Sequence, residues 1–176
     1  MHVRTKAGLV VGIVALGVGA VLAAQGQRAS PHETASATVD GAKITVEYGR
    51  PYMKGRKIFG GLVPIGQVWR TGADEATILT TDATLALGIL TVPPGKYSLF
   101  TIPGESEWTL IVNKQTGQWG TRYDAGQDLG RTTMKTQPTG GAVEQFEIKI
   151  SDTAAGGELR FQWENTRAIA PFVVKR

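Results

Sequence analysis

The sequence KITVEY, at residues 43–48, alternates polar and apolar side chains without a break. Its apolar members fall on one face of an extended chain and its polar members on the other, which is the period of a strand with one buried face. The same alternation returns near the C-terminus in FEIKI, residues 146–150, and in LRFQWE, residues 159–164. These runs predict β-strands with one face in contact with water.

Two other runs, residues 97–102 and 108–112, carry apolar side chains on both faces. This pattern predicts central strands that are covered from both sides. Further strand signals lie at residues 35–39, 76–80, 84–87 and 131–136. Asp40-Gly41 is a strong tight-hairpin signal. Other turns are predicted at Pro93-Pro94-Gly95, Pro103-Gly104, Pro138 to Gly141 and Gly156-Gly157.

About eight short strands with regular turn signals predict an all-β fold, an antiparallel β-sandwich, preceded by a single N-terminal helix. We expect an N-terminal segment at residues 1–24, a linker at residues 25–33 and one domain at residues 34–176. A domain of this size, roughly 150 residues, is large enough for a single well-buried core.

One segment, residues 49–74, breaks the strand pattern because it is rich in glycine, proline and charge. Loops of this length in compact domains are often functional or packed by their own side chains. Packing is the simpler interpretation. It predicts that the apolar residues of the segment cover one end of the sandwich, namely Ile58, Phe59, Leu62, Val63, Ile65 and Trp69.

Several motifs together resemble a family of bacterial proteins, the domain of unknown function numbered 2911. They are GRKIFGGLVPIGQVWRTGADEAT at residues 55–77, PPGKYSLFTIPG at residues 93–104, Glu107-Trp108, and Gln118-Trp119-Gly120. The resemblance covers residues 30–169. It implies an exported, small all-β domain, and it brings no established activity or catalytic residues.

The densest group of cations is Arg50, Lys54, Arg56 and Lys57. It is either a solvated loop or a docking patch for an acidic partner or for anionic lipid head groups. Outside the N-terminal segment the chain carries a net charge of only +2, because Arg4 and Lys6 supply the other two of its four net positive charges. This near balance gives no indication of a nucleic-acid partner.

A possible ligand site comprises Trp69, Arg70, Asp74, Glu75 and Trp119. Paired carboxylates beside an arginine can share acid and base roles, but a salt bridge that holds the loop is the simpler alternative. Trp108 and Trp163 alternate with apolar neighbours and are expected in the core, which leaves Trp119 as the candidate for an exposed stacking surface.

No catalytic constellation, cofactor pattern or metal pattern is evident. The chain has no cysteine, which excludes disulfides and thiolate chemistry. Its two histidines, His2 and His32, are both expected outside the folded core. Any proton transfer would therefore fall to carboxylates.

The N-terminal segment combines a basic flank with an uncharged run at residues 7–24. As a helix this run measures roughly 27 Å, close to the thickness of a bilayer core. Its small residues share one helix face and could pack against another helix: Gly8, Gly12, Ala15, Gly19 and Ala23. The segment is either a single span with a cytoplasmic N-terminus in a bacterial inner membrane, or a signal cleaved near Ala24 that releases a periplasmic or secreted domain.

Three functions remain open. The first is a non-catalytic accessory subunit that lies in the lipid bilayer through its N-terminal helix and docks on a larger membrane protein complex, with energy-transducing assemblies as candidate hosts. The second is a secreted module that binds a ligand or glycan. The third is a carboxylate-dependent enzyme. The sequence alone favours them in that order.

Overall fold

A computed structural model describes residues 30–175 of the chain. The predicted N-terminal helix, including the face formed by Gly8, Gly12, Ala15, Gly19 and Ala23, lies outside the described residues. Within residues 30–175, no helix has both the length and the hydrophobicity that crossing a membrane requires.

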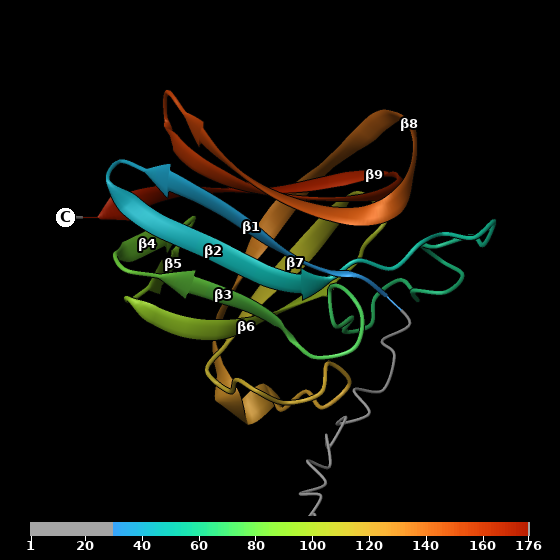
Figure 1. Cartoon of the computed structure of the whole chain (residues 1–176), viewed down its shortest axis with the longest axis horizontal. Coiled ribbons are helices and arrows are strands. Elements are labelled where there is room, and N and C mark those ends of the chain that lie inside the picture. Colours follow the sequence, from blue (N-terminus) through green and yellow to red (C-terminus); the bar gives the residue numbers. More distant parts are fainter. Residues whose placement is uncertain (1–29, 176) are drawn as a thin grey trace, which may run out of the picture.

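The prediction of an all-β antiparallel fold is confirmed. Residues 30–175 form nine strands and one short 3-10 helix, η1 (Ala125–Gln127). The strands are β1 (His32–Val39), β2 (Ala42–Gly49), β3 (Thr77–Thr81), β4 (Thr84–Leu87), β5 (Leu90–Val92), β6 (Gly95–Ile102), β7 (Glu107–Asn113), β8 (Asp128–Thr153) and β9 (Gly156–Lys175) (Figure 1).

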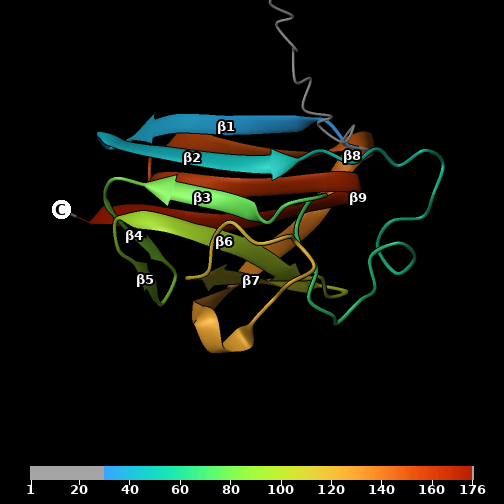
Figure 2. The same ribbon diagram turned by 60° about the horizontal axis from the view of Figure 1, so that its bottom comes forward.

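The nine strands form one continuous sheet in the order β1-β2-β3-β6-β7-β8-β9-β4-β5. Figure 2 shows β1, β2, β3, β6 and β7 side by side in one layer, with β8 and β9 behind them. The layers join on one side where β7 pairs with β8. On the other side the chain just after β2 reaches β8, because Phe146 N donates to Pro51 O at 2.9 Å and Met53 N donates to Glu144 O at 2.7 Å. The sheet therefore curls around the core instead of forming two separate sheets.

The tight hairpin predicted at Asp40-Gly41 is confirmed. Val39 pairs with Ala42 across the turn, and both turn residues have positive φ, 47° for Asp40 and 82° for Gly41. Positive φ at both central positions is what a type I′ hairpin requires, and Asp-Gly adopts it readily.

The turn predicted at Pro138 to Gly141 is wrong. Strand β8 continues through this stretch, and its register against β9 jumps from Pro138↔Thr166 to Val143↔Glu164. Residues 139–142 therefore form a bulge in a long strand, where an extra stretch of chain is accommodated without ending the pairing. The turn predicted at Gly156-Gly157 falls two residues earlier, since β8 ends at Thr153 and β9 begins at Gly156.

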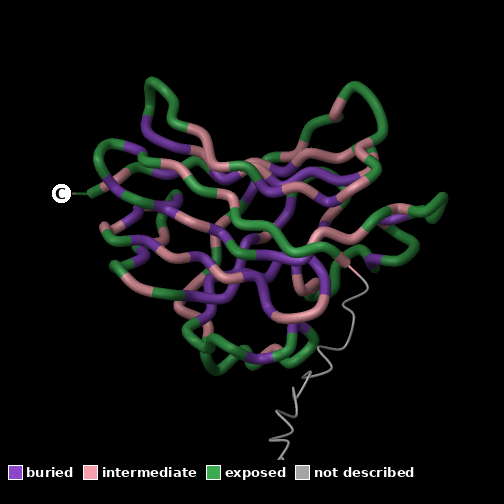
Figure 3. The backbone as a smooth tube through the Cα atoms, viewed as in Figure 1, coloured by how far each residue is buried: buried purple, intermediate pink, exposed green. Residues whose placement is uncertain are grey.

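The strands predicted to be covered on both faces are buried on both faces. Residues 97–101 in β6 and residues 110–113 in β7 are all buried. One face meets the main core, and the other forms a small second cluster of Ala76, Phe100 and Ile111 that packs against Tyr123. Figure 3 shows the resulting run of buried backbone through the middle of the sheet.

The loop at residues 49–74 covers one end of the core only in part. Ile58 and Val63 are buried, and Phe59 and Trp69 pack against the core. Leu62 and Ile65 instead remain 48% and 40% exposed. The expectation that all six apolar side chains cover the core is therefore wrong for these two, because they lie in exposed turns just before and just after the buried Val63.

Candidate functional site

The centre of the candidate site is the site loop, residues 69–75, which joins the segment after β2 to β3. Trp69 and Thr101 exchange backbone hydrogen bonds of 2.7 and 3.0 Å, so the loop begins as an extra strand pair on β6. At its other end, Gly120 N donates to Asp74 O at 2.9 Å. The site loop is thus fixed between β6 and the segment around residues 118–120.

The backbone of the site loop is strained. Thr71 and Asp74 have φ values of 55° and 64°, a region that non-glycine residues rarely adopt and that is unusual for a β-branched side chain. Buried hydrogen bonds hold Thr71 in place: its Oγ1 lies 3.0 Å from Thr101 Oγ1, and Thr77 Oγ1 donates to Thr71 O at 2.7 Å. Strain of this kind persists only where surrounding structure enforces it, and it clusters at functional sites.

Two glycines let other segments approach the site loop closely. A Cβ at Gly49 would lie 2.3 Å from Ala73 O, and a Cβ at Gly120 would lie 2.8 Å from Asp74 O. Both neighbours are backbone atoms, so they could not move aside without shifting the loop. These positions therefore require glycine for packing.

The carboxylates of the site loop face a histidine. His32 Nε2 lies 3.4 Å from Asp74 Oδ2 and 3.4 Å from Glu75 Oε2. His32 is exposed and outside the hydrophobic core, as expected, but it is the first residue of β1. The hairpin centred on Asp40-Gly41 places His32 opposite Gly49, and Gly49 packs on the site loop.

A cleft of about 590 Å³ opens beside the site loop, within the range typical of small-molecule sites. Much of its lining is apolar or aromatic, including Tyr52, Leu62, Val63, Val68, Trp69 and Tyr123. Burial, together with a hydrogen bond from the hydroxyl to Asp128, raises the pKa of the Tyr123 phenol. Tyr123 therefore remains a neutral, protonated side chain at physiological pH.

Three cations line this cleft: Lys54 and Arg56 lie near the start of the 49–74 segment and Arg70 lies near its end. None of them forms an ion pair with a carboxylate of residues 30–175. Among residues 30–175, Arg70 Nε donates to Gly72 O alone, at 3.3 Å. The salt bridge considered for Arg70 and Asp74 is not formed, because the Asp74 carboxylate turns toward His32.

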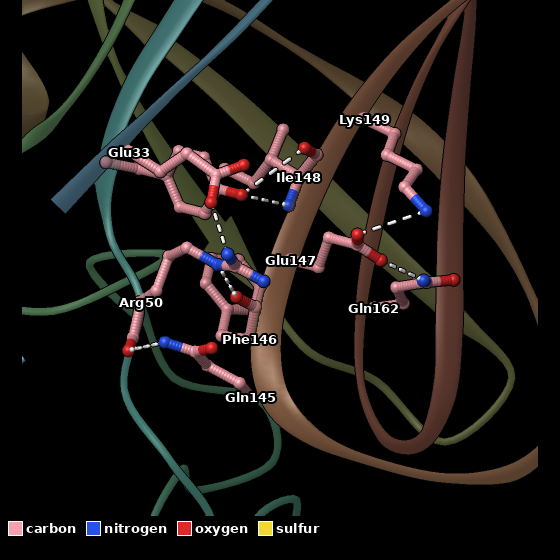
Figure 4. A network of polar contacts seen from close by, with 9 residues as sticks. Glu33, Arg50, Gln145, Phe146, Glu147, Ile148, Lys149 and Gln162 are labelled. Carbon is pink, nitrogen blue, oxygen red and sulfur yellow. Dashed lines mark hydrogen bonds and ion pairs between the residues drawn. The ribbon is translucent and has the colours of Figure 1, made fainter. Parts of the chain in front are cut away.

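The four cations predicted as a docking patch divide into two pairs. Arg50 is structural: its guanidinium pairs with Glu33 and donates to Phe146 O at 3.1 Å, as Figure 4 shows. Arg56 folds back on its own turn and donates to Met53 O and Tyr52 O. Lys54 and Lys57 are exposed, and neither ammonium pairs with a carboxylate of the described part of the chain.

The tryptophans differ in how far they are buried. Trp108 and Trp163 are 2% and 1% exposed, which confirms that both belong to the core. Trp119 is 46% exposed and forms an isolated backbone bridge with Glu75. Gly120 and Thr121 line the cleft but Trp119 does not, so the structure places Trp119 beside the site loop and outside the cleft.

Glu75 likewise falls outside the cleft. It lines a second hollow of about 410 Å³ with His32, Glu33 and Glu47. Among the described residues, no group of three or more histidine and carboxylate side chains is arranged to hold a metal ion.

Comparison with known proteins adds one match. The family model described as Protein of unknown function (DUF2911) matches residues 30–172, nearly the whole described domain. No curated protein and no solved structure matches the chain significantly. The resemblance carried by the sequence motifs is therefore confirmed, and no activity comes with it.

Proposed function

The chain belongs to the DUF2911 family of unknown function, and from that premise we propose that its β domain is a non-catalytic module that binds a small anionic ligand. The observation that carries the proposal is the cleft beside the site loop, in which three cations face a largely apolar wall. The structure thus leads us to rank a ligand-binding module first, whereas the sequence alone favours a docking subunit.

The positive charge of the cleft indicates that the ligand is an anion. A cleft with Lys54, Arg56 and Arg70 raises the local concentration of anions, and low-dielectric walls strengthen the field. Asp74 does not offset these cations fully, because it supplies one carboxylate to the lining against three cations. Arginine also suits carboxylate, sulfonate or phosphate groups, which it can bind through two parallel hydrogen bonds.

The volume and the apolar lining of the cleft indicate the size and the body of the ligand. The volume of about 590 Å³ suits a molecule of metabolite size. Tyr52 and Trp69 offer aromatic surface, and Leu62 and Val68 offer aliphatic surface. An anion with a planar or apolar body would therefore fit better than a free inorganic ion.

The test uses two fluorescent probes of the same shape. 8-Anilinonaphthalene-1-sulfonate carries a sulfonate, and N-phenyl-1-naphthylamine lacks it. We expect the sulfonate probe to bind at least about tenfold more tightly, and Arg70→Gln to remove about tenfold of that affinity, the equivalent of one hydrogen-bonded charge. Lys96→Gln is the control, because it removes the same charge from an exposed position outside the cleft. Equal binding of both probes, or an equal loss in the two variants, would contradict the proposal.

Docking on a larger membrane complex is a second proposal, and it rests on the apolar run at residues 7–24. The intact mass of the native protein in washed membranes and in the periplasmic fraction tests its first step. A membrane species that retains this run supports a single span in the inner membrane, and a soluble species that begins near Ala24 supports a secreted module. If Gly12→Leu left association with the complex intact, helix packing through the small-residue face would be wrong.

The geometry does not favour a carboxylate-dependent enzyme. That hypothesis needs Arg70, Asp74 and Glu75 around one pocket. Arg70 and Asp74 line the cleft, whereas Glu75 lines the separate hollow with His32.

A further inference from the structure

The basic lobe, residues 50–68, extends beyond the ends of the strands (Figure 2). Four of its large apolar side chains are substantially exposed: Tyr52, Leu62, Ile65 and Val68, at 37–48%. They make up more than half of the exposed large hydrophobic side chains in the described part of the chain. Apolar exposure concentrated in one protruding segment indicates a surface that meets another apolar phase.

The charge of the lobe has one sign. Residues 50–68 contain two arginines and two lysines and no acidic residue, and the next carboxylate along the chain is Asp74. Arg50 and Arg56 serve the fold, as described above. Lys54 and Lys57 are exposed and carry the charge outward.

The lobe is held in shape by the domain. Glu164 accepts hydrogen bonds from Ile58 N at 3.3 Å and Phe59 N at 3.2 Å, and Glu144 Oε1 accepts from Lys54 N at 2.9 Å. Within the lobe, Val63 N donates to Ile58 O at 2.9 Å. These contacts bury Ile58 and Val63 while leaving their neighbours outside, so the exposed apolar surface is formed before any partner arrives.

The position of the lobe in the chain favours a membrane over other partners. Ser30, where the described chain begins, lines the cleft beside the lobe. Only residues 25–29 separate Ser30 from the apolar run that ends at Ala24. Five residues span at most about 18 Å, so a bilayer that holds residues 7–24 would lie within reach of the lobe.

From these observations we propose that the basic lobe is an interfacial contact with an anionic phospholipid bilayer. Leu62, Ile65 and Val68 enter the boundary between head groups and acyl chains, and Lys54 and Lys57 bind the anionic head groups. Apolar side chains beside lysines are the composition that interfacial segments share. Lys54, Leu62 and Val68 also line the cleft, whereas Lys57 and Ile65 do not, so a change at residue 57 or a label at residue 65 reports on the membrane contact separately from the cleft.

The absence of cysteine allows a clean test, because each labelled variant carries a single thiol. Ile65→Cys and Ile89→Cys in the full-length chain are labelled with the environment-sensitive dye NBD. Ile89 is the matched control: it is 97% exposed and lies in the β4–β5 turn, at the other end of the sheet from the lobe (Figure 1). Both proteins are reconstituted into vesicles of phosphatidylcholine, with and without phosphatidylglycerol.

We expect NBD emission at residue 65 to shift to the blue in the vesicles that contain phosphatidylglycerol, and emission at residue 89 to stay unchanged. Lys54→Gln or Lys57→Gln should lower the ratio of bound to unbound lobe about fivefold each, as expected for one cation near an anionic surface. Lys96→Gln should have no effect. High salt should reverse the shift.

Three results would overturn the proposal. Emission at residue 65 could stay unshifted, like that at residue 89, in every vesicle, which is also the outcome expected if the lobe binds an acidic protein. The two positions could shift equally, which would mean that the lobe is not the contact. The shift could be the same without phosphatidylglycerol, which would remove the role of anionic lipid.

Discussion

Trp69 stacks on Trp163 with ring centroids 5.9 Å apart and planes inclined by 18°, whereas Phe59 meets both rings edge-on. Trp69 opens the site loop and Trp163 lies in β9, so this pair connects the site loop to the core. Parallel and edge-on aromatic contacts each add stability beyond the area that the rings bury. The wall of the cleft is therefore an extension of the core.

Replacing the buried partner of this pair should be costly. Trp163→Ala should lower the free energy of unfolding by about 3–5 kcal/mol, because it leaves a cavity among packed aromatic rings. Trp119→Ala, at a position that is 46% exposed, should change it by less than about 0.5 kcal/mol. Urea denaturation followed by circular dichroism measures both. Similar costs for the two variants would contradict the assignment of Trp163 to the core.

Tyr48 connects β2 to β8 through its hydroxyl. The Oη atom accepts from Ile148 N at 2.9 Å and lies 3.4 Å from Ile148 O. Burial raises the pKa of this phenol, so it stays protonated at neutral pH. Tyr48→Phe should cost about 1–3 kcal/mol of unfolding free energy, since the buried Ile148 N–H loses its partner. Tyr52→Phe, at an exposed tyrosine, is the control and should be close to neutral.

Gly49 is predicted to tolerate no side chain. In Gly49→Ala the added Cβ would press on Ala73 O and push the site loop away from β2. We expect a loss of stability of about 1–3 kcal/mol from this overpacking, together with weaker binding of the sulfonate probe. Gly141→Ala is the matched control, because a Cβ there meets no atom within 4 Å. A stable Gly49→Ala protein with unchanged probe affinity would show that the close approach is not needed.

Glu147 should make stability depend on pH in the acid range. Burial alone would raise its pKa, but hydrogen bonds from Lys149 and Gln162 outweigh burial and hold the pKa below the ordinary value. A carboxylate whose pKa is lower in the folded protein stabilises the fold above its unfolded pKa, and this contribution is lost as the pH falls through the folded pKa.

The measurement compares urea unfolding of the wild type and Glu147→Gln at neutral pH and near pH 3, below the ordinary glutamate pKa of about 4.3. The wild type should be the more stable at neutral pH, and the difference should shrink in acid. Glu105→Gln, at an exposed glutamate, controls for the loss of one negative charge. A difference between wild type and Glu147→Gln that grew toward acid pH would reverse the sign and refute the argument.

The strands were predictable where the pattern of side chains is local. Alternation identified β2, two-sided burial identified β6 and β7, and the predicted run at residues 84–87 coincides with β4. Strand β5 has only three residues before Pro93, too few to show a period. The bulge in β8 was misread because Pro138 and Gly140 have the composition of a turn, and only pairing with β9 shows that the strand continues.

The candidate site was predictable only in part, because its partners are far apart in sequence. The 49–74 segment stands out by its composition, and the structure brings its Trp69, Arg70 and Asp74 to one cleft. The four cations of the predicted docking patch are close in sequence, but they are not all available to a partner. Arg50 instead pairs with Glu33 and donates to the backbone of Phe146, which lies 96 residues away. No local pattern reveals such partners.

The pairing of β8 with β9 has a consequence for how the chain folds. Its contacts grow outward from Thr153↔Gly156 to Lys135↔Ile169, so it closes by short loops at low entropic cost. The Tyr48 contact with Ile148 joins residues 100 positions apart. It forms only after the long chain between β2 and β8 has been brought together, a step that the β8–β9 hairpin does not need. We therefore expect the hairpin to be formed in the folding transition state and the Tyr48 contact to form after it. In stopped-flow experiments, Tyr48→Phe should then speed unfolding and leave the folding rate almost unchanged.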